Sequence, residues 1–261
     1  MPIDVQRISR DIEAIAGFNE SSPDIGYSRP TFSPAWRKAR DYVIAEAESV
    51  GCKIRIDAAG NVHARPAKLD WEHPAWLSGS HIDSVTSGGK FDGVVGVVCP
   101  LDVLRAAREI GRDDLPLELI IFAEEEGTTF GMGMIGSRLW TGDATAESVR
   151  PFRNRDGQDY FQAGESHGVR TNNLATDRIN PAHYLGMIEI HIEQGPAMWE
   201  TNIPIALVTA IAGRKQFKIQ LVGQANHAGS TPMSYRIDAL AAAAKIITGV
   251  ESMARDLSPQ T

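Results

Sequence analysis

Apolar residues near the start of the chain recur at the spacing of a helix. A helix is predicted over residues 4–16, ended by Gly17, because one face of it would carry Val5, Ile8, Ile12 and Ile15. A second helix is predicted over residues 34–50. Ser33 is suited to cap its first turn, Pro34 to its first position and Gly51 to its end. Its buried stripe would consist of Trp36, Ala39, Val43, Ala47 and Val50.

The period then changes from that of a helix to that of a strand. Residues 53–65 alternate between apolar and polar positions around the turn sequence Ala59-Gly60-Asn61, which predicts a hairpin. Buried strands are predicted at the apolar runs 75–77, 117–123 and 187–190, with a helical segment at 94–110 between the first two. Pro100 lies inside that segment, so either one helix bends there or a second helix begins there. This order of strands and helices predicts an α/β sheet covered on both faces.

The pattern changes again after Gly213. A strand is predicted over residues 216–222, where Phe217, Ile219 and Leu221 share one face, and an Ala-rich helix over residues 235–256. One strand and one helix are too few to bury a core. We therefore expect a catalytic domain at 1–213, lacking its C-terminal return, and the beginning of a second domain at 214–261 that breaks off at Thr261.

Charge and composition exclude several classes of function. The formal net charge is −7, whereas binding to nucleic acid or to an anionic membrane needs a basic surface. No apolar run approaches the roughly 20 residues of a membrane span. The two cysteines cannot form a disulfide scaffold in a chain of this size, and the N-terminus lacks the features of a signal peptide. The expected protein is cytoplasmic and soluble, without a nucleic-acid or membrane partner.

Four polar segments follow apolar strands or precede an apolar helix. They contain His81 and Asp83, then Asp92 among glycines, then Glu124-Glu125-Glu126, and finally His191. Each has a commoner structural explanation when taken alone, such as a hydrogen-bonded histidine or a turn aspartate. Together, in one α/β domain, they favour a metal site, because the ends of strands in such sheets meet at the ligand-binding edge. Asp83 would hold the second ring nitrogen of His81 and leave the first free for a metal.

The chemistry of such a site follows from its donor atoms. Imidazole and carboxylate ligands suit Zn²⁺, with Mn²⁺, Co²⁺ and Ni²⁺ as alternatives. Two ions about 3.5–4 Å apart share a bridging carboxylate and polarise a water molecule. A neighbouring carboxylate that is not a ligand then takes the proton.

Five motifs together resemble the hydantoinase/carbamoylase branch of the dinuclear-zinc carboxypeptidase and aminoacylase superfamily. This branch contains N-carbamoyl-L-amino-acid hydrolases, allantoate amidohydrolases and β-ureidopropionases. The motifs are Gly79-Ser80-His81-Ile82-Asp83-Ser84-Val85, Phe91-Asp92-Gly93, Glu124-Glu125-Glu126-Gly127, His191-Ile192-Glu193-Gln194-Gly195-Pro196 and Asn226-His227-Ala228-Gly229-Ser230-Thr231-Pro232-Met233.

The resemblance implies a fold and an activity. The fold would be zinc-exopeptidase-like, with a mixed, mostly parallel sheet flanked by helices and the start of a smaller α+β lid and dimerisation domain. The activity would be hydrolysis of a linear amide or ureido C–N bond in an N-carbamoyl-L-amino acid or an allantoate-like compound, by a metal-activated water. The full-length form would be a homodimer.

The resemblance also implies a role for each motif residue. His81 and His191 would bind one metal ion, Glu126 would bind the other, and Asp92 would bridge the two. Glu125 would be the general base and Asp83 would orient His81. Glu126 is taken as the ligand because it directly precedes Gly127; the exchanged assignment of the two glutamates is the alternative.

Two further residues are expected to act on the substrate. Gln194 would contact the substrate or support the site. His227 would stabilise the oxyanion and, in the relatives, reaches the active site of the other subunit. The resemblance also implies a last histidine ligand beyond the end of this sequence, so this chain alone is expected to have little or no activity. An aminopeptidase or aminoacylase activity, or a truncated chain that binds metal without catalysis, are the competing interpretations.

Overall fold

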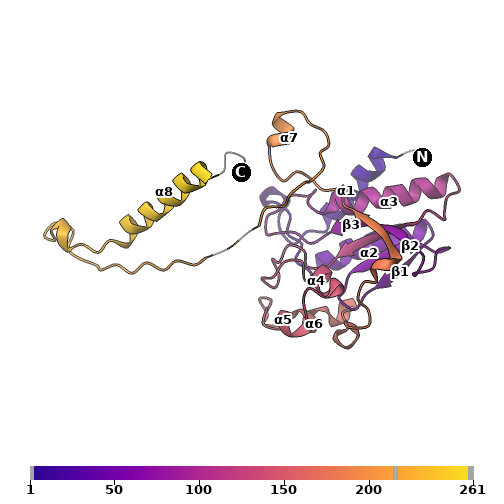
Figure 1. Ribbon diagram of the computed structural model, residues 1–261, viewed down its shortest axis with the longest axis horizontal. Coiled ribbons are helices and arrows are strands. Elements are labelled where there is room, and N and C mark those ends of the chain that lie inside the picture. Colours follow the sequence, from indigo (N-terminus) through magenta and orange to yellow (C-terminus); the bar gives the residue numbers. More distant parts are fainter. Residues whose placement is uncertain (1–2, 214, 216, 258–261) are drawn as a thin grey trace. The chain divides into compact units, whose positions relative to one another are not determined.

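The computed structural model describes residues 3–213, 215 and 217–257, in two units, Met1–Pro204 and Ile205–Thr261. The first unit contains a five-stranded sheet. Its strands are β1 (Cys52–Ile56), β2 (Val62–Pro66), β3 (Ala75–His81), β4 (Leu117–Phe122) and β5 (Tyr184–Ile188). They lie in the order β1-β2-β4-β3-β5, so β1 and β5 are the two edge strands. Figure 1 shows the ribbon of this unit with its helices. The predicted mixed α/β fold is confirmed.

The direction of each pairing decides which loops share an end of the sheet. The pairs β1–β2 and β2–β4 are antiparallel, as the predicted hairpin requires. The pairs β3–β4 and β3–β5 are parallel. The carboxyl ends of β3, β4 and β5 therefore lie at one edge of the sheet, where open α/β sheets place their ligand sites.

Three long helices belong to this unit: α1 (Val5–Gly17), α2 (Pro34–Ser49) and α3 (Val94–Glu109). The Asp4 and Ser33 side chains accept hydrogen bonds from first-turn N–H groups of α1 and α2, so both helices begin where the sequence predicts. Helix α3 continues through Pro100, which excludes the start of a second helix there. The exposed fraction of the Pro100 side chain is small, so the proline ring is part of the helix's buried face.

The two faces of the sheet carry different partners. Val62 of β2 lines a small void with Val43 of α2, on the side of the long helices. His63, the next residue, points to the opposite face, where its ring centroid lies 5.1 Å from that of Trp140 in α4 (Ile135–Thr141). Both faces are thus covered, and the hydrophobic core cluster extends from Ile12 to Val169.

The shorter helices connect these elements. They are α5 (Ala146–Val149), α6 (Tyr160–Gly164) and α7 (Ala197–Glu200), with 3₁₀ turns at Pro23–Ile25, Glu165–His167, Thr171–Asn173, Pro181–His183 and Met233–Tyr235. Within the described residues, no helix has both the length and the apolar character that crossing a bilayer demands.

The second unit differs from the prediction in two places. Its helix α8 (Ala239–Leu257) begins later than residue 235, because Asp238 accepts hydrogen bonds from the N–H groups of Leu240 and Ala241 and so sets the helix start. The predicted strand at 216–222 is wrong over its described residues: 217–222 form no strand. Alternating side chains alone do not make a strand, because its backbone needs a paired neighbour, and none is found in the described part of this unit.

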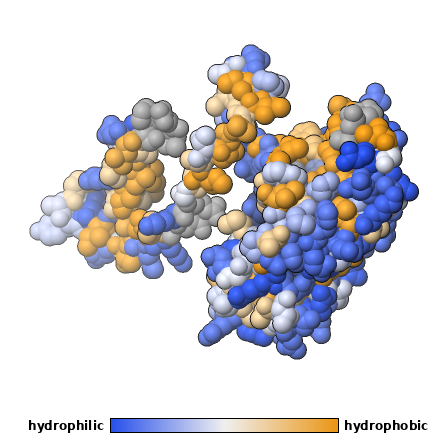
Figure 2. All heavy atoms as spheres, turned by 45° about the vertical axis from the view of Figure 1, so that its right-hand side comes forward, coloured by the Kyte–Doolittle hydropathy of each residue, from blue (hydrophilic) through white to orange (hydrophobic). Residues whose placement is uncertain are grey.

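The two units also differ in how far their apolar side chains are exposed. Helix α8 has no buried residue, and the segment before it exposes Ile205, Leu207 and Ile211 almost completely. Figure 2 shows much of the visible surface of the first unit in hydrophilic colours. The described residues of the second unit therefore contribute nothing to the buried core.

Candidate metal centre

Strand pairing brings three of the four predicted segments together. In the parallel register of β3 and β4, His81 lies opposite Phe122, and the acidic triplet begins two residues farther along. Strand β5 runs parallel to β3 on its other side, and its continuation carries His191. Ser80 donates a hydrogen bond of 2.5 Å to Glu189, which ties this continuation to β3. The strand directions, rather than proximity in sequence, create the cluster.

The fourth segment reaches the cluster through a glycine. Asp92 precedes Gly93, which caps α3 with a φ of 66°. A Cβ atom at Gly93 would lie 2.5 Å from both Cδ2 and Nε2 of His81. Only glycine combines this left-handed backbone with so close an approach to the imidazole. The Phe91-Asp92-Gly93 motif thus places Asp92 directly against His81.

Two histidines face one oxygen of Asp92. His191 Nε2 lies 3.2 Å from Asp92 Oδ1, and His81 Nε2 lies 3.7 Å from the same atom. The ligand atoms of these three residues all lie within 4.8 Å of one another. Gln194 Nε2 donates a hydrogen bond of 2.8 Å to the other carboxylate oxygen, Oδ2. Asp92 is therefore held on one side and directed at both imidazoles on the other.

A second group consists of His81, Glu125 and Glu126, whose ligand atoms meet the same 4.8 Å limit. Glu125 Oε2 lies 3.5 Å from His81 Nε2. His81 belongs to both groups, while the resemblance implies Asp92 as the shared ligand. The assignment of base and ligand between the two glutamates stays a prediction, because both lie beside the same imidazole.

Asp83 orients His81 through an atom that the sequence analysis did not anticipate. His81 Nδ1 lies 2.9 Å from the Asp83 backbone carbonyl oxygen, a hydrogen bond in which the ring N–H donates. The carboxylate oxygen Oδ1 lies farther away, at 3.7 Å. The other oxygen, Oδ2, accepts a hydrogen bond of 3.1 Å from the Glu126 N–H. One buried aspartate thus fixes both the imidazole and the acidic loop, and leaves Nε2 free to face the cluster.

The charges of the cluster shift its pKa values strongly. Burial lowers the pKa of His81, but the carboxylates of Asp92, Asp83 and Glu125 outweigh it and raise that pKa to about 10. Contact with Asp92 raises the pKa of His191 to about 9. Contacts with His191 and then with His81 hold the pKa of Asp92 far below its usual range. Burial raises the pKa of Glu126 to about 7 and also raises that of Glu125.

These features fit a divalent cation. Asp92 Oδ1 is buried, has no hydrogen-bond partner, and faces two imidazole nitrogens. The carboxylates that raise the pKa values of His81 and His191 also favour positive charge at this position, and a divalent cation supplies it. Nitrogen and carboxylate donors in this proportion suit Zn²⁺ and its first-row neighbours. The donors present therefore match the group that the sequence predicts.

Glu124 is a buried residue of the site for which the sequence analysis proposed no role. Its side chain is fully buried, its φ is 51°, and its Oε1 accepts hydrogen bonds of 2.9 Å from the N–H groups of Thr129 and Phe130. Burial, followed by the charge of Asp83, raises the pKa of Glu124 to about 7. The acidic triplet is recognisable in the sequence. No hydrophobic periodicity, however, distinguishes Glu124, which is buried, from Glu125 and Glu126, which face the cluster.

His227 lies in the second unit. Its Nδ1 accepts hydrogen bonds of 3.1 Å from the N–H groups of Gly229 and Ser230, so the Asn-His-Ala-Gly-Ser motif forms a local turn around the ring. The predicted role of His227 on the substrate stays a prediction.

A cavity of about 800 Å³ lies elsewhere in the first unit. It is lined by hydroxyl and amide side chains, and its charged residues balance: Arg37, Arg155, Glu20 and Asp156. It includes none of the residues of the two ligand groups.

Comparison with known proteins agrees with the motifs. The chain is 35% identical over 257 residues to the N-carbamoyl-L-amino-acid amidohydrolase of Paenarthrobacter aurescens, covering 98% of this chain and 62% of the relative. It is 34% identical over 253 residues to the ureidoglycolate hydrolase of Oryza sativa subsp. japonica, covering 95% of this chain and 52% of the relative. No family model matches.

A solved structure extends this agreement to the fold. The crystal structure of a hydantoinase/carbamoylase family amidase from Burkholderia ambifaria superposes with a TM-score of 0.75 and 30% sequence identity, over 98% of this chain and 62% of that chain. The chain thus spans about three-fifths of the length of this amidase, at 62%.

Fold and site together define an α/β protein with a histidine–carboxylate cluster at the carboxyl edge of its sheet. Over nearly its whole length the chain is similar to amidohydrolases of the hydantoinase/carbamoylase family. The resemblance drawn from its motifs is confirmed.

Proposed function

We propose that the protein carrying this chain is a metal-dependent amidohydrolase that cleaves a C–N bond in a small ureido compound. The observation that supports this most directly is the convergence of His81, His191 and two acidic segments on one edge of the sheet. The relatives named as N-carbamoyl-amino-acid and ureidoglycolate hydrolases supply the substrate class. The activity is proposed for the whole protein, since the chain spans 62% and 52% of those relatives.

The proposed metal complement is two divalent ions, with Zn²⁺ first and Mn²⁺, Co²⁺ or Ni²⁺ as alternatives. His81, His191 and Asp92 would hold one ion, and Glu126 together with Asp92 would hold the other. When bound, the ions supply positive charge that makes a water molecule more acidic and stabilises the developing oxyanion.

The side chains of the chain supply proton transfer and orientation. Glu125 is partly open to solvent, with a side-chain exposure of 36%, and burial raises its pKa. A carboxylate with a raised pKa is a better proton acceptor at neutral pH. Glu125 is thus proposed to take a proton from the attacking water and to deliver it to the departing nitrogen. Gln194 would hold Asp92 in place, and His227 would donate a hydrogen bond to the oxyanion in a homodimer.

The reaction would add one water across the carbamoyl C–N bond. For an N-carbamoyl-L-amino acid the products are the free amino acid, carbon dioxide and ammonia. The substrate would be a small molecule, and recognition would rest on hydrogen bonds to the ureido group rather than on a peptide backbone.

Substrate profiling of the metal-loaded natural protein tests this proposal. N-carbamoyl-L-amino acids and allantoate are compared with N-acetyl amino acids and dipeptides, and with N-carbamoyl-D-amino acids as the matched control. We expect ammonia release from the ureido compounds with a preference for the L-series. Hydrolysis confined to dipeptides or to N-acetyl amino acids would reject the ureido substrate and favour an aminopeptidase or an aminoacylase.

A further inference from the structure

The turn between β1 and β2 reaches the base of the acidic loop through one side chain. Asn61 is fully buried in this turn. Its Oδ1 accepts a hydrogen bond of 3.0 Å from the N–H of Ala123, the residue before the acidic triplet. Its Nδ2 donates a hydrogen bond of 3.1 Å to the carbonyl oxygen of Gly136 in α4. A single carboxamide therefore joins the two backbone segments that flank the loop.

The Asn61 carboxamide occupies a position that strand pairing would otherwise fill. Strands β2 and β4 pair up to Val62 and Ile121, and there the ladder ends. Beyond it, the side chain of Asn61 rather than a strand backbone accepts the N–H of Ala123, two residues past Ile121. An unpaired N–H or C=O group in this interior would be costly, because no water is there to replace its partner.

The Ala123 and Gly136 segments hold the acidic loop by a series of backbone bonds. Gly136 N–H donates to the Ala123 carbonyl at 2.9 Å, Ile135 N–H to that of Glu124 at 3.0 Å, and Met134 N–H to that of Glu125 at 2.8 Å. Asn61 closes the inner end of this series. A displacement of Ala123 or Gly136 would therefore shift the backbone to which Glu125 is bonded.

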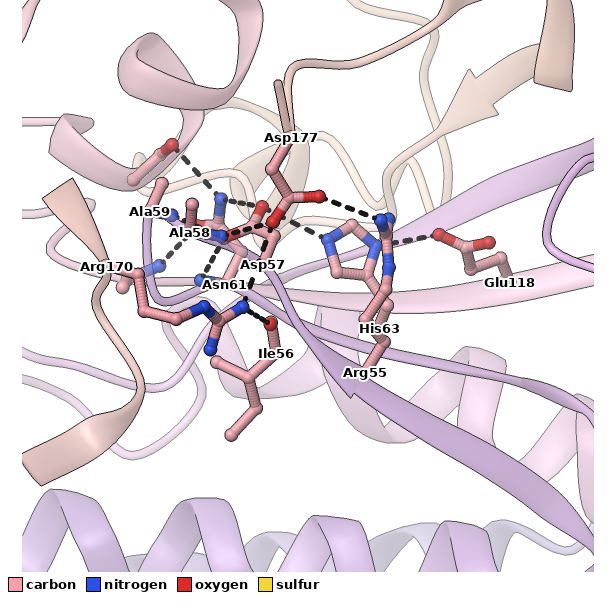
Figure 3. A network of polar contacts seen from close by, with 12 residues as sticks. Arg55, Ile56, Asp57, Ala58, Ala59, Asn61, His63, Glu118, Arg170 and Asp177 are labelled. Carbon is pink, nitrogen blue, oxygen red and sulfur yellow. Dashed lines mark hydrogen bonds and ion pairs between the residues drawn. The ribbon is translucent and has the colours of Figure 1, made fainter. Parts of the chain in front are cut away.

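The orientation of the Asn61 amide is itself fixed. Asp57 Oδ2 accepts a hydrogen bond of 2.8 Å from Asn61 Nδ2, so the donor and acceptor ends of the amide cannot exchange. The other oxygen, Asp57 Oδ1, accepts hydrogen bonds of 2.9 Å from the N–H groups of Ala59 and Asn61 and holds the turn. Asp177 adds a bond of 2.6 Å from Ala58 N–H. Figure 3 shows this network around Asp57 and Asn61.

The space around Gly136 is too small for a side chain. A Cβ atom on Gly136 would lie 2.2 Å from Asn61 Oδ1 and 2.7 Å from the Ala123 carbonyl oxygen. Helix α4 thus approaches the amide as closely as a residue without a side chain allows. The contact depends on both residues, Asn61 and Gly136.

We propose that Asn61 is a positioning residue for the metal cluster: through the backbone of Ala123 and Gly136, it sets where Glu125 and Glu126 face His81. Asn61 itself touches none of the cluster's donor atoms. This inference rests on the proposed metal site, and it adds a residue of the distant hairpin turn to the parts that determine how tightly that site binds metal.

Zinc binding to this chain provides the test, because it needs no turnover. Zn²⁺ stoichiometry and affinity are measured by competition with a chromogenic chelator, and Co²⁺ absorption reports the ligand geometry. For Asn61→Ala we expect Zn²⁺ affinity to fall about 10-fold or more, the range seen for residues that support metal ligands, together with a changed Co²⁺ spectrum. Gly136→Ala disturbs the same contact from the other side and should act in the same direction, even if Asn61→Ala does not fold.

Tyr42→Phe is the matched control. It removes a hydrogen bond of 2.6 Å from Tyr42 Oη to Asp11, between α1 and α2 and outside the acidic loop. We expect this variant to lose thermal stability while the folded protein keeps the wild-type zinc affinity and Co²⁺ spectrum. Wild-type zinc affinity in folded Asn61→Ala and Gly136→Ala would overturn the positioning role and leave the metal site standing. Absence of zinc binding by the wild-type chain would overturn the metal site and the inference with it.

Discussion

Gln194 Nε2 donates a hydrogen bond to Asp92 Oδ2 across 2.8 Å, although the two residues are 102 positions apart in the sequence. Gln194 has a φ of 58°, a left-handed backbone that a side chain rarely adopts. Strained residues of this kind persist where the surrounding structure needs their position. The bond leaves Asp92 Oδ1 directed at His81 and His191. A support of this kind fixes the geometry of a metal ligand without contacting the metal.

Removal of the Gln194 amide should therefore weaken metal binding. For Gln194→Ala we expect the Zn²⁺ affinity to fall about 10-fold, because Asp92 loses the bond that orients it. Alanine carries a Cβ as glutamine does, so the backbone strain is unchanged. Chelator competition measures the affinity, and the exposed Gln158→Ala provides the control. Equal affinity in Gln194→Ala and wild type would show that Asp92 is oriented without Gln194.

Gly93 provides a test of the close approach of Asp92 to His81. Gly93 and Gly111 both have positive φ values, 66° and 76°, but only Gly93 would bring a Cβ against another residue. Both alanine substitutions should destabilise the fold by about 1–3 kcal/mol through backbone strain. Only Gly93→Ala should also lower zinc affinity, because its Cβ displaces the His81 ring. Thermal unfolding and zinc titration of the two variants separate the two effects. Loss of zinc affinity in Gly111→Ala as well would attribute the effect to strain alone.

The roles of Glu125 and Glu126 are separable by paired substitutions in the natural protein. Glu125→Gln should lower kcat by about 10²–10⁴ while the metal content stays at the wild-type level, since a general base contributes to proton transfer only. Glu126→Gln should lower the metal content first and turnover as a consequence. Steady-state kinetics and elemental analysis of the same samples give both quantities. The reverse pattern would exchange the two assignments and leave the proposed reaction intact.

His63 is expected to give the fold a pH dependence that is independent of the proposed metal site. Its ring is fully buried, with Nδ1 2.7 Å from Glu118 and Nε2 3.2 Å from Asp57. Burial lowers the pKa of His63, but hydrogen bonds to Asp57 and Glu118 outweigh it, so the pKa rises above the ordinary value of 6.5. Glu118 is also held by Arg65 and by the hydroxyl of Tyr184.

The sign of the effect on stability follows from this shift. Between pH 6.5 and the folded pKa, the unfolded chain has lost the His63 proton and the folded chain still holds it. The free energy of unfolding therefore falls as pH rises from 6.5 to the folded pKa. The contribution is complete below pH 6.5. We expect the difference in unfolding free energy between wild type and His63→Gln to shrink as pH rises above 6.5. Urea denaturation with chelator present measures it, and a difference independent of pH would show that His63 is neutral in the fold.

Local sequence signals predicted most elements of the first unit because each element obeys a local rule. Ser33 caps α2, the alternation around Gly60 makes the β1–β2 hairpin, and the apolar runs become β3 and β4. The bounds of β5 do not follow a local rule. Its pairing with β3 begins at Tyr184 and ends where Ile188 lies opposite Ser78, so the partner strand rather than the apolar run sets these bounds.

The site was predictable as a set of residues but not as a geometry. The motifs identify His81, Asp92 and His191, and parallel strands bring them to one edge. Three features depend on backbone paths that no residue pattern encodes. They are the contact of the Asp83 carbonyl with His81, the burial of Glu124, and the hydrogen bond between Asn61 and Ala123. The predicted strand at 216–222 fails for the same kind of reason, because a strand needs a paired neighbour.

Zinc content of the chain with and without Asp92 tests the central claim most directly. Wild type, Asp92→Asn and the surface control Asp114→Asn are loaded with Zn²⁺, freed of excess ion and analysed by plasma mass spectrometry, with circular dichroism to confirm folding. We predict tightly bound zinc in wild type and in Asp114→Asn, and its loss from folded Asp92→Asn. Zinc retained by Asp92→Asn, or absent from wild type, would contradict the assignment of this cluster as a metal centre.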